Sequence, residues 1–180
     1  MIHLTTNRIR ALCILADGKQ HFAEDLAHAL NMKLSNFNAD VLKALESASF
    51  CCYDTTPIET HKRGRPRRPI VLKKDELPFI AQNIHSQIML NLARSNCAFE
   101  EYESAKGNLS PLRDEKLTED RLNYTDKAEE IMDVLDIPLF RDEVAKIYKK
   151  EGISGQELRD LIYLEIGVTS TIKLRKPSTS

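Results

Sequence analysis

Hydrophobic residues recur every three or four positions through most of the first fifty residues, a spacing that predicts three helices. The predicted helices cover residues 5–18, 23–31 and 36–49, and Ser35 is expected to cap the third. A short extended piece, residues 19–22, separates the first two. The side chains expected to face inward are Ile9, Leu12, Cys13, Leu15, Ala16, Leu26, Ala27, Leu30, Val41, Leu42 and Leu45.

The pattern changes after the third helix. Residues 50–56 and 69–73 are rich in residue types that favour strands, and a long connection containing Gly64 and Pro66 joins them. Two strand-forming runs joined in this way predict a β-hairpin. The expected order is therefore helix, short extended piece, helix, helix, strand, loop, strand.

This order, with the residues at 22–55 and 61–73, resembles a winged helix-turn-helix domain, the fold of many bacterial and archaeal transcription regulators. The resemblance implies that the third helix enters the DNA major groove and that the hairpin forms a wing. Members of such families usually carry an aliphatic residue near the start of the third helix, where Asn38 stands here. They often carry glycine before the first wing strand, where Ser49 stands.

Charge is unevenly distributed along the chain. The 180 residues carry a net charge of -1, yet residues 57–74 hold seven Lys or Arg against one acidic residue. Without this segment the first eighty residues would be acidic. A polyanion would therefore meet a local basic patch rather than a basic protein.

The segment Arg63–Arg67, with the sequence RGRPR, resembles the AT-hook core that lies in the minor groove of A/T-rich DNA. Gly64 removes a side chain where the backbone must approach the groove floor, and Pro66 fixes φ and holds Arg65 extended. A narrow A/T minor groove attracts an inserted arginine. The neighbouring phosphates would be contacted by Lys62, Arg63, Arg67 and Arg68. The alternative is a solvated loop whose charge has no partner.

The third helix offers a second group of DNA-binding candidates. Its exposed polar residues, with Lys33 in the preceding turn, are expected to be Ser35, Asn36, Asn38 and Lys43. Asparagine can bind adenine through two hydrogen bonds. Asp40 and Glu46 oppose the approach of phosphate, so the alternative is a helix that only packs the core while the wing binds.

The second half of the chain is predicted to be helical and is acidic overall. A long helix over 80–105 carries Ile84, Ile88, Leu92 and Phe99, which would serve either as a dimer face or as the core against residues 128–166. Residues 104–123 are polar, contain Gly107 and Pro111, and are predicted to be a linker or exposed turn. A helix over 126–136 is expected to end at Pro138, and two short amphipathic helices follow.

Other chemistry has weak support in the sequence. Four cysteines without a C-x-x-C pair favour reduced thiols, with Cys51 as a small core residue. His21, Asp25 and His28 would give a metal only three ligands, so no metal or cofactor is expected. The chain shows none of the common catalytic motifs, and we do not expect an enzyme. The N-terminus lacks a signal-peptide core, and no apolar run is long enough to span a bilayer.

The fold class expected from these patterns is mainly α with a small β-hairpin: a winged helix-turn-helix domain over 1–78 and an all-α module over 79–180. The expected function is a cytoplasmic, nucleoid-associated regulator that binds double-stranded, A/T-rich DNA as a homodimer. The C-terminal helices would dimerise or bind a protein partner. The main alternative is a winged-helix protein-interaction module, and RNA binding is a third.

Overall fold

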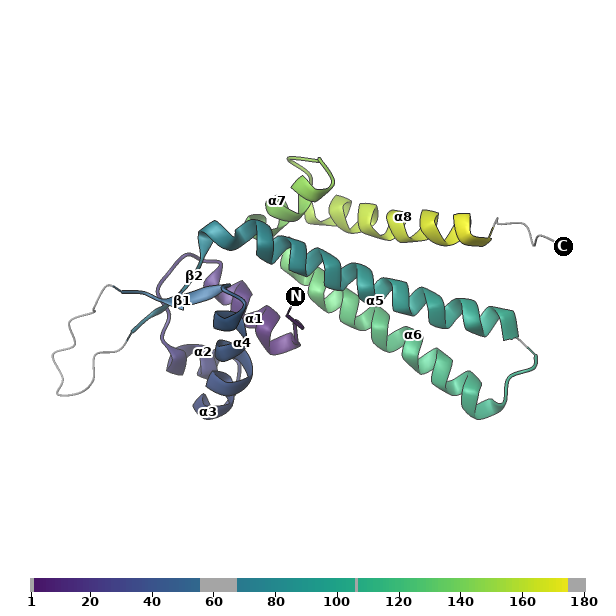
Figure 1. Ribbon diagram of the computed structural model, residues 1–180, viewed down its shortest axis with the longest axis horizontal. Helices are drawn as coiled ribbons and strands as arrows, with labels where there is room; N and C mark the ends of the chain where they lie inside the picture. The colour runs from purple at the N-terminus through teal and green to yellow at the C-terminus, as the bar shows by residue number, and fades with distance from the viewer. Residues whose placement is uncertain (1, 56–67, 106, 175–180) are drawn as a thin grey trace. The chain divides into compact units, whose positions relative to one another are not determined.

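The computed structural model of the protein describes residues 2–55, 68–105 and 107–174. In these residues it is mainly helical and holds one two-stranded antiparallel sheet, as predicted. The chain divides into two compact units, Met1–Asn83 and Ile84–Ser180. The division lies inside the long helix α5 (Leu77–Ala105), labelled in Figure 1.

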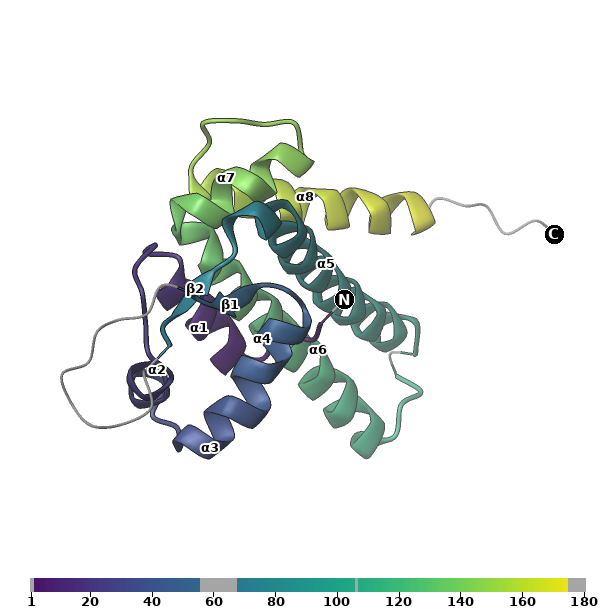
Figure 2. The same cartoon turned by 60° about the vertical axis from the view of Figure 1, so that its left-hand side comes forward.

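The N-terminal unit consists of short helices and a β-hairpin. Its elements in chain order are α1 (Thr6–Leu15), α2 (Ala23–Ala29), α3 (Leu34–Asn36), the π-helical segment η1 (Phe37–Leu42), α4 (Lys43–Ser47), β1 (Cys51–Tyr53), β2 (Ile70–Leu72), the 3-10 turn η2 (Lys74–Glu76) and the first turns of α5. Figures 1 and 2 show α1, α2 and the continuous helical stretch α3–η1–α4 gathered beside the two strands. Three helical stretches thus precede the hairpin, in the predicted order.

The predicted apolar faces form the core of this unit. Buried side chains are Ile9, Leu12, Leu15, Leu26, Ala27, Leu30, Val41, Leu42 and Leu45, whereas Cys13 and Ala16 are half-buried. Two aromatic residues that the helical pattern did not assign to the core, Phe37 and Phe50, are each only 1% exposed. Burial of a large apolar side chain contributes about 1.5–3 kcal/mol, so these two are major parts of the core.

The hairpin pairs Cys51 with Leu72 and Tyr53 with Ile70. The extended piece before α2 joins the same sheet, because the backbones of His21 and Ile70 exchange two hydrogen bonds, at 3.1 and 2.6 Å. Strand β2 therefore has a backbone partner on each side. This pairing fixes the base of the hairpin against the helices.

The third helical stretch begins before its predicted cap. Lys33 occupies the N-cap position, and its carbonyl accepts the first helical hydrogen bond from the Phe37 N–H at 2.9 Å. Ser35 already lies in the first turn, and its hydroxyl is 3.4 Å from the amide oxygen of Asn36. The prediction that Ser35 caps this helix is therefore wrong.

Ser49 ends this helical stretch in the left-handed region, with φ of 62°. The Ser49 N–H donates to the Glu46 carbonyl at 2.9 Å, and the Phe50 N–H donates to the Leu45 carbonyl at 2.8 Å. These bonds form a Schellman motif, in which glycine usually occupies the left-handed position. Glycine adopts this conformation without the steric cost that a Cβ adds, so the backbone at position 49 favours it.

Replacing Ser49 with glycine is expected to stabilise the protein by about 0.5–1 kcal/mol. Relief of the left-handed strain on a residue with a Cβ outweighs the entropy that glycine loses on folding. The matched control is Ser47→Gly at the last helical position of α4, which should cost about 0.5–1 kcal/mol instead. Thermal unfolding midpoints of the two variants should move in opposite directions, and a lower midpoint for Ser49→Gly would contradict the expectation.

The C-terminal unit is entirely helical in the described residues. It contains the rest of α5, then α6 (Pro111–Met132), the 3-10 turn η3 (Asp133–Asp136), α7 (Pro138–Ile147) and α8 (Gly155–Leu174). Its buried apolar residues include Leu117, Ala128, Ile131, Met132, Val134, Leu135, Phe140, Val144, Leu158 and Ile162. None of the helices in the described residues has both the length and the apolar character needed to cross a bilayer.

Helices α5 and α6 form an antiparallel pair, which Figures 1 and 2 show side by side. The buried Ser95 hydroxyl lies 2.7 Å from the Thr125 hydroxyl, and Arg113 at the start of α6 pairs with Glu101 near the end of α5. The prediction of a linker over 104–123 is therefore wrong beyond residue 110. Ser110 caps α6, accepting a hydrogen bond from the Arg113 N–H, and Pro111 starts the helix rather than breaking it.

The apolar stripe proposed as a dimer face lies mostly in the core. Ile84 and Ile88 are 0% exposed and Leu92 is 5% exposed, whereas Phe99 is 39% exposed. The first three residues are therefore covered by the chain itself. Any dimer of this protein must use other residues.

Candidate nucleic-acid interface

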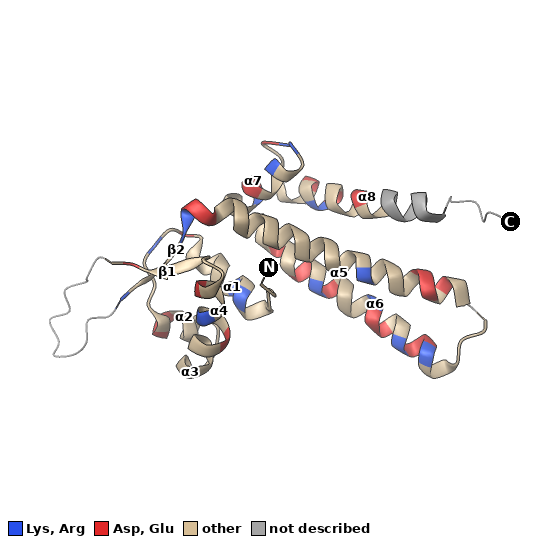
Figure 3. Ribbon diagram, in the orientation of Figure 1, with Lys and Arg blue, Asp and Glu red and all other residues tan. Residues whose placement is uncertain are grey.

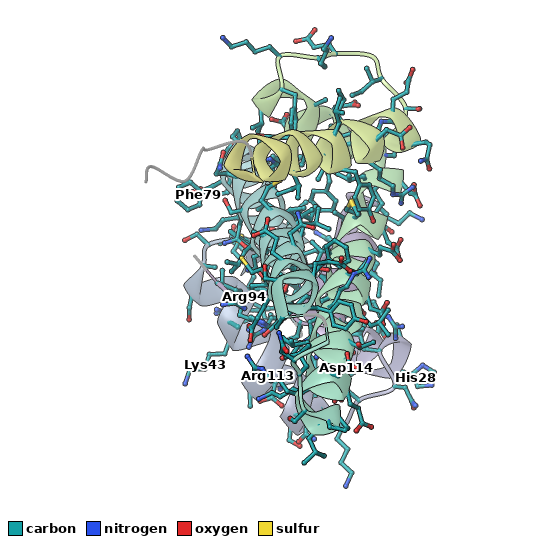
Figure 4. The ribbon with its side chains drawn as sticks, turned by 90° about the vertical axis from the view of Figure 1, so that its right-hand side faces the viewer. His28, Lys43, Phe79, Arg94, Arg113 and Asp114 are labelled. Atoms are coloured by element: carbon teal, nitrogen blue, oxygen red, sulfur yellow. The ribbon has the colours of Figure 1, made fainter. Side chains whose placement is uncertain are left out.

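The polar residues predicted to contact DNA from the third helix all lie on one exposed stretch of the N-terminal unit. Lys33 precedes the helical stretch, and Ser35, Asn36, Asn38 and Lys43 lie along it, each with an exposed side chain. Figure 4 shows the Lys43 side chain extending away from its helix. The core residues of η1 and α4 face the other way, so the amphipathic pattern positions these polar groups.

The charge of this stretch is mixed. Lys33 and Lys43 are exposed, and so is Asp40, while Glu46 is half-buried. Figure 3 shows basic and acidic segments mixed over the helices of this unit. The helix alone does not form a strongly basic surface, so attraction of a polyanion must come mainly from another segment.

The structure also shows which residue near the start of the third helix faces the core. Phe37, not Asn38, provides the apolar anchor near its start, because Phe37 is 1% exposed whereas Asn38 is exposed. Asn38 is thereby free of the core. A regular helical period places Phe37 on one face with Val41 but not with Leu42, so the sequence pattern alone did not identify this anchor.

The basic loop leaves the sheet at a defined place. Asp54 and Pro69 close the hairpin, with the Asp54 N–H donating to the Pro69 carbonyl at 2.7 Å. The side-chain amide of Gln20 donates to the Asp54 carboxylate at 2.6 Å, which ties the hairpin end to the segment before α2. Thr55 and Arg68, the described ends of the loop, are both exposed. The predicted DNA-binding residues from Lys62 to Arg67 lie outside the described residues.

Arg8 of α1 is a contact of the third helix that the sequence did not indicate. Its Nε and Nη2 donate to the backbone carbonyl of Asp40 at 2.9 and 2.7 Å, and its Nη1 donates to the His3 carbonyl at 2.6 Å. A single half-exposed arginine thus joins the N-terminal segment, α1 and the π-helical segment. No motif or periodicity marks such a side-chain-to-backbone contact in advance.

The other candidate groups are accounted for by packing and pairing. Burial raises the pKa of the Cys51 thiol to about 12, which favours the neutral form expected of a core residue. The His21 ring lies 2.9 Å from Asp17, and this hydrogen bond is the main cause of the lowered pKa of Asp17. Within residues 2–55, 68–105 and 107–174 the structure holds no group of three side chains suited to a metal ion, and His21, Asp25 and His28 do not form one.

A further polar contact holds the C-terminal unit together. The His85 ring of α5 lies 2.7 Å from the hydroxyl of Tyr148, just after α7, with the two rings in an edge arrangement. Burial lowers the pKa of His85 and raises the pKa of Tyr148, and a hydrogen bond to Glu165 raises the latter further. These shifts favour the neutral forms of both rings, as expected for a packing contact between helices.

Comparisons of this chain with models of protein families, with curated proteins and with solved structures find no match.

Proposed function

We propose that the N-terminal unit is a winged helix-turn-helix domain and that the protein is a DNA-binding transcriptional regulator that prefers A/T-rich duplexes. The observation that carries the proposal is the position of the basic segment. The densest basic stretch of the chain connects two paired strands whose base is bonded to the segment before α2 through His21 and Asp54. A winged helix presents its wing from such a hairpin.

In the proposed binding mode, the wing and the third helix contact different grooves of the DNA. Arg65, with Gly64 and Pro66 around it, would enter an A/T minor groove, where the potential is most negative. The third helix would present Asn36 and Asn38 to the edges of bases in the major groove. The remaining cations, which would contact phosphates, are Lys33, Lys43, Lys62, Arg63, Arg67 and Arg68. Phosphate contacts position the protein, and base contacts specify the site.

Binding of the whole chain to short duplexes tests this proposal. With the six proposed phosphate contacts, affinity for an A/T-rich duplex should fall about 1,800-fold between roughly 50 and 200 mM salt, because each contact releases condensed counterions. A G/C-rich duplex of the same length should bind more weakly at every salt concentration. Fluorescence anisotropy measures the affinities for both duplexes. An affinity that does not change with salt, or the absence of binding at roughly 50 mM salt, would contradict the proposal.

Selection of bound sequences from a random duplex pool shows which element reads DNA. A/T enrichment without a longer motif would mean that only the wing discriminates. A palindrome would support a homodimer, since two-fold symmetric half-sites require two copies of the domain. We place dimerisation in the C-terminal unit, on residues other than the buried Ile84, Ile88 and Leu92.

A protein-interaction module is the second candidate. Its support is the presence of the exposed Asp40 and the half-buried Glu46 on the third helical stretch, which would suit a basic partner better than DNA phosphates. Absence of duplex binding in a folded protein would favour this candidate.

A further inference from the structure

The proposed base-reading helix is not a regular α-helix. Residues Phe37–Leu42 form a π-helical segment, and at its end the Lys43 N–H donates to the Asn38 carbonyl, five residues earlier. The wider turn lets Phe37, Val41 and Leu42 all reach the core. π-Helical turns are rare in proteins and are frequent at functional sites.

This segment changes the direction of the exposed residues around it. Successive residues of an α-helix are rotated by about 100° about the helix axis. One extra residue in a turn therefore changes the direction of every side chain that follows it. Of the proposed base contacts, Asn38 lies within this segment and has an exposed side chain. Its angle relative to Asn36 therefore depends on whether the π-helical turn is kept.

Arg8 is bonded to the middle of this turn. Two of its N–H groups converge on the Asp40 carbonyl, at 2.9 and 2.7 Å, while a third holds the His3 carbonyl at 2.6 Å. Hydrogen bonds from a charged donor are stronger than those between neutral groups. The guanidinium is a planar fork with several fixed donors, a geometry that lysine does not reproduce.

We infer that Arg8 is a positioning residue that sets sequence discrimination by holding the π-helical turn of the third helix, without itself contacting bases. The inference rests on the proposed DNA-binding function. Through the Asp40 carbonyl, Arg8 fixes the angle at which Asn38 meets the major groove. Affinity for DNA of any sequence, which the wing and phosphate contacts provide, does not depend on it.

The test compares Arg8→Lys with Arg10→Lys in the full chain. Arg10 is an exposed residue two positions away on the same helix, so the control makes the same chemical change without the Asp40 contact. The probes are the duplex selected from the random pool and a scrambled duplex of equal A/T content. Arg8→Lys should reduce the ratio of the two affinities about tenfold, the value of one good base contact, with affinity for the scrambled duplex and its salt slope unchanged. Arg10→Lys should leave the ratio unchanged.

Amide hydrogen exchange gives an independent readout. Arg8→Lys should speed exchange in residues 38–45 while the amides of α2 and the strands keep their protection. Arg8→Gln, which retains a planar amide donor, serves as the second variant. If neither variant folds, Arg8 has a structural role and the inference is overturned.

The failures of the inference and of the proposed function are distinguishable. If the wild-type protein binds no duplex, the proposed function fails and this inference falls with it. If the wild type discriminates between the two duplexes and Arg8→Lys discriminates equally well, only the inference is overturned. Binding by the wild type without discrimination would leave the wing as the DNA-binding element and would also overturn the inference.

Discussion

Replacing both Arg65 and Arg67 with alanine is expected to weaken binding to an A/T-rich duplex about 100-fold at low salt. Each arginine contributes about 1–3 kcal/mol in such contacts, and the two lie on either side of Pro66 in the motif that resembles an AT-hook. The salt dependence should also become shallower, because Arg67 is one of the residues proposed to contact phosphate. Anisotropy titrations at several salt concentrations measure both changes.

The matched control removes the same charge elsewhere. Lys116 and Lys150 are exposed lysines of the C-terminal unit, and replacing both with alanine lowers the net charge equally. This control should bind within about twofold of the wild type, because neither lysine is among the proposed phosphate contacts. Equal losses in the two double variants would mean that only net charge matters, and an unaffected Arg65→Ala/Arg67→Ala variant would contradict the wing model.

Hydrophobic periodicity predicted the N-terminal unit well because its helices are amphipathic. Leu26, Leu30 and Leu45 are buried where the pattern places them. The same reasoning assumed a regular period of 3.6 residues, and a π-helical segment breaks that period. The register of the third helix, including the burial of Phe37 beside the exposed Asn38, therefore required the structure.

Pro111 shows why the C-terminal unit was harder to predict. It was interpreted as part of a linker or exposed turn, yet it starts α6, where the missing N–H has no helical partner to lose. The helical stretch before Pro138 does end before that residue, as predicted, and Pro138 starts α7. The first half of α6 also buries little apolar surface, since Leu117 is its main core residue. A helix with such a polar sequence depends on contacts with α5, such as the hydrogen bond between the hydroxyls of Ser95 and Thr125, which are 30 positions apart in the chain. Arg113 and Asp114 lie in the first turn of α6 (Figure 4).

The candidate site also has a part that the sequence predicts and a part that it does not. Its exposed polar residues follow from the amphipathic pattern, because whatever is not turned to the core must face solvent. The contact between Arg8 and the Asp40 carbonyl does not follow, since it joins residues 32 positions apart through a backbone atom. Neither the types nor the spacing of the residues around Arg8 predict such a partner.

Replacing Phe37 with alanine is expected to destabilise the N-terminal unit by about 3–5 kcal/mol, the cost of removing a fully buried aromatic ring. This is a large part of the stability of a typical domain, which is about 5–15 kcal/mol. Phe79→Ala is the matched control: its ring is 66% exposed, so the same chemical change should cost below about 1 kcal/mol. Urea unfolding followed by amide resonances of residues 6–55 measures the loss in this unit.

Asn38→Ala completes the comparison because it tests the register directly. An exposed asparagine should be replaced at a cost within about 0.5 kcal/mol, and affinity for the selected duplex should fall instead. A regular α-helix with position 38 toward the core would give the reverse order, with a tolerant Phe37 and a sensitive Asn38. The pair of variants therefore separates the residue that holds the third helix in the core from the residue that the helix presents to its ligand.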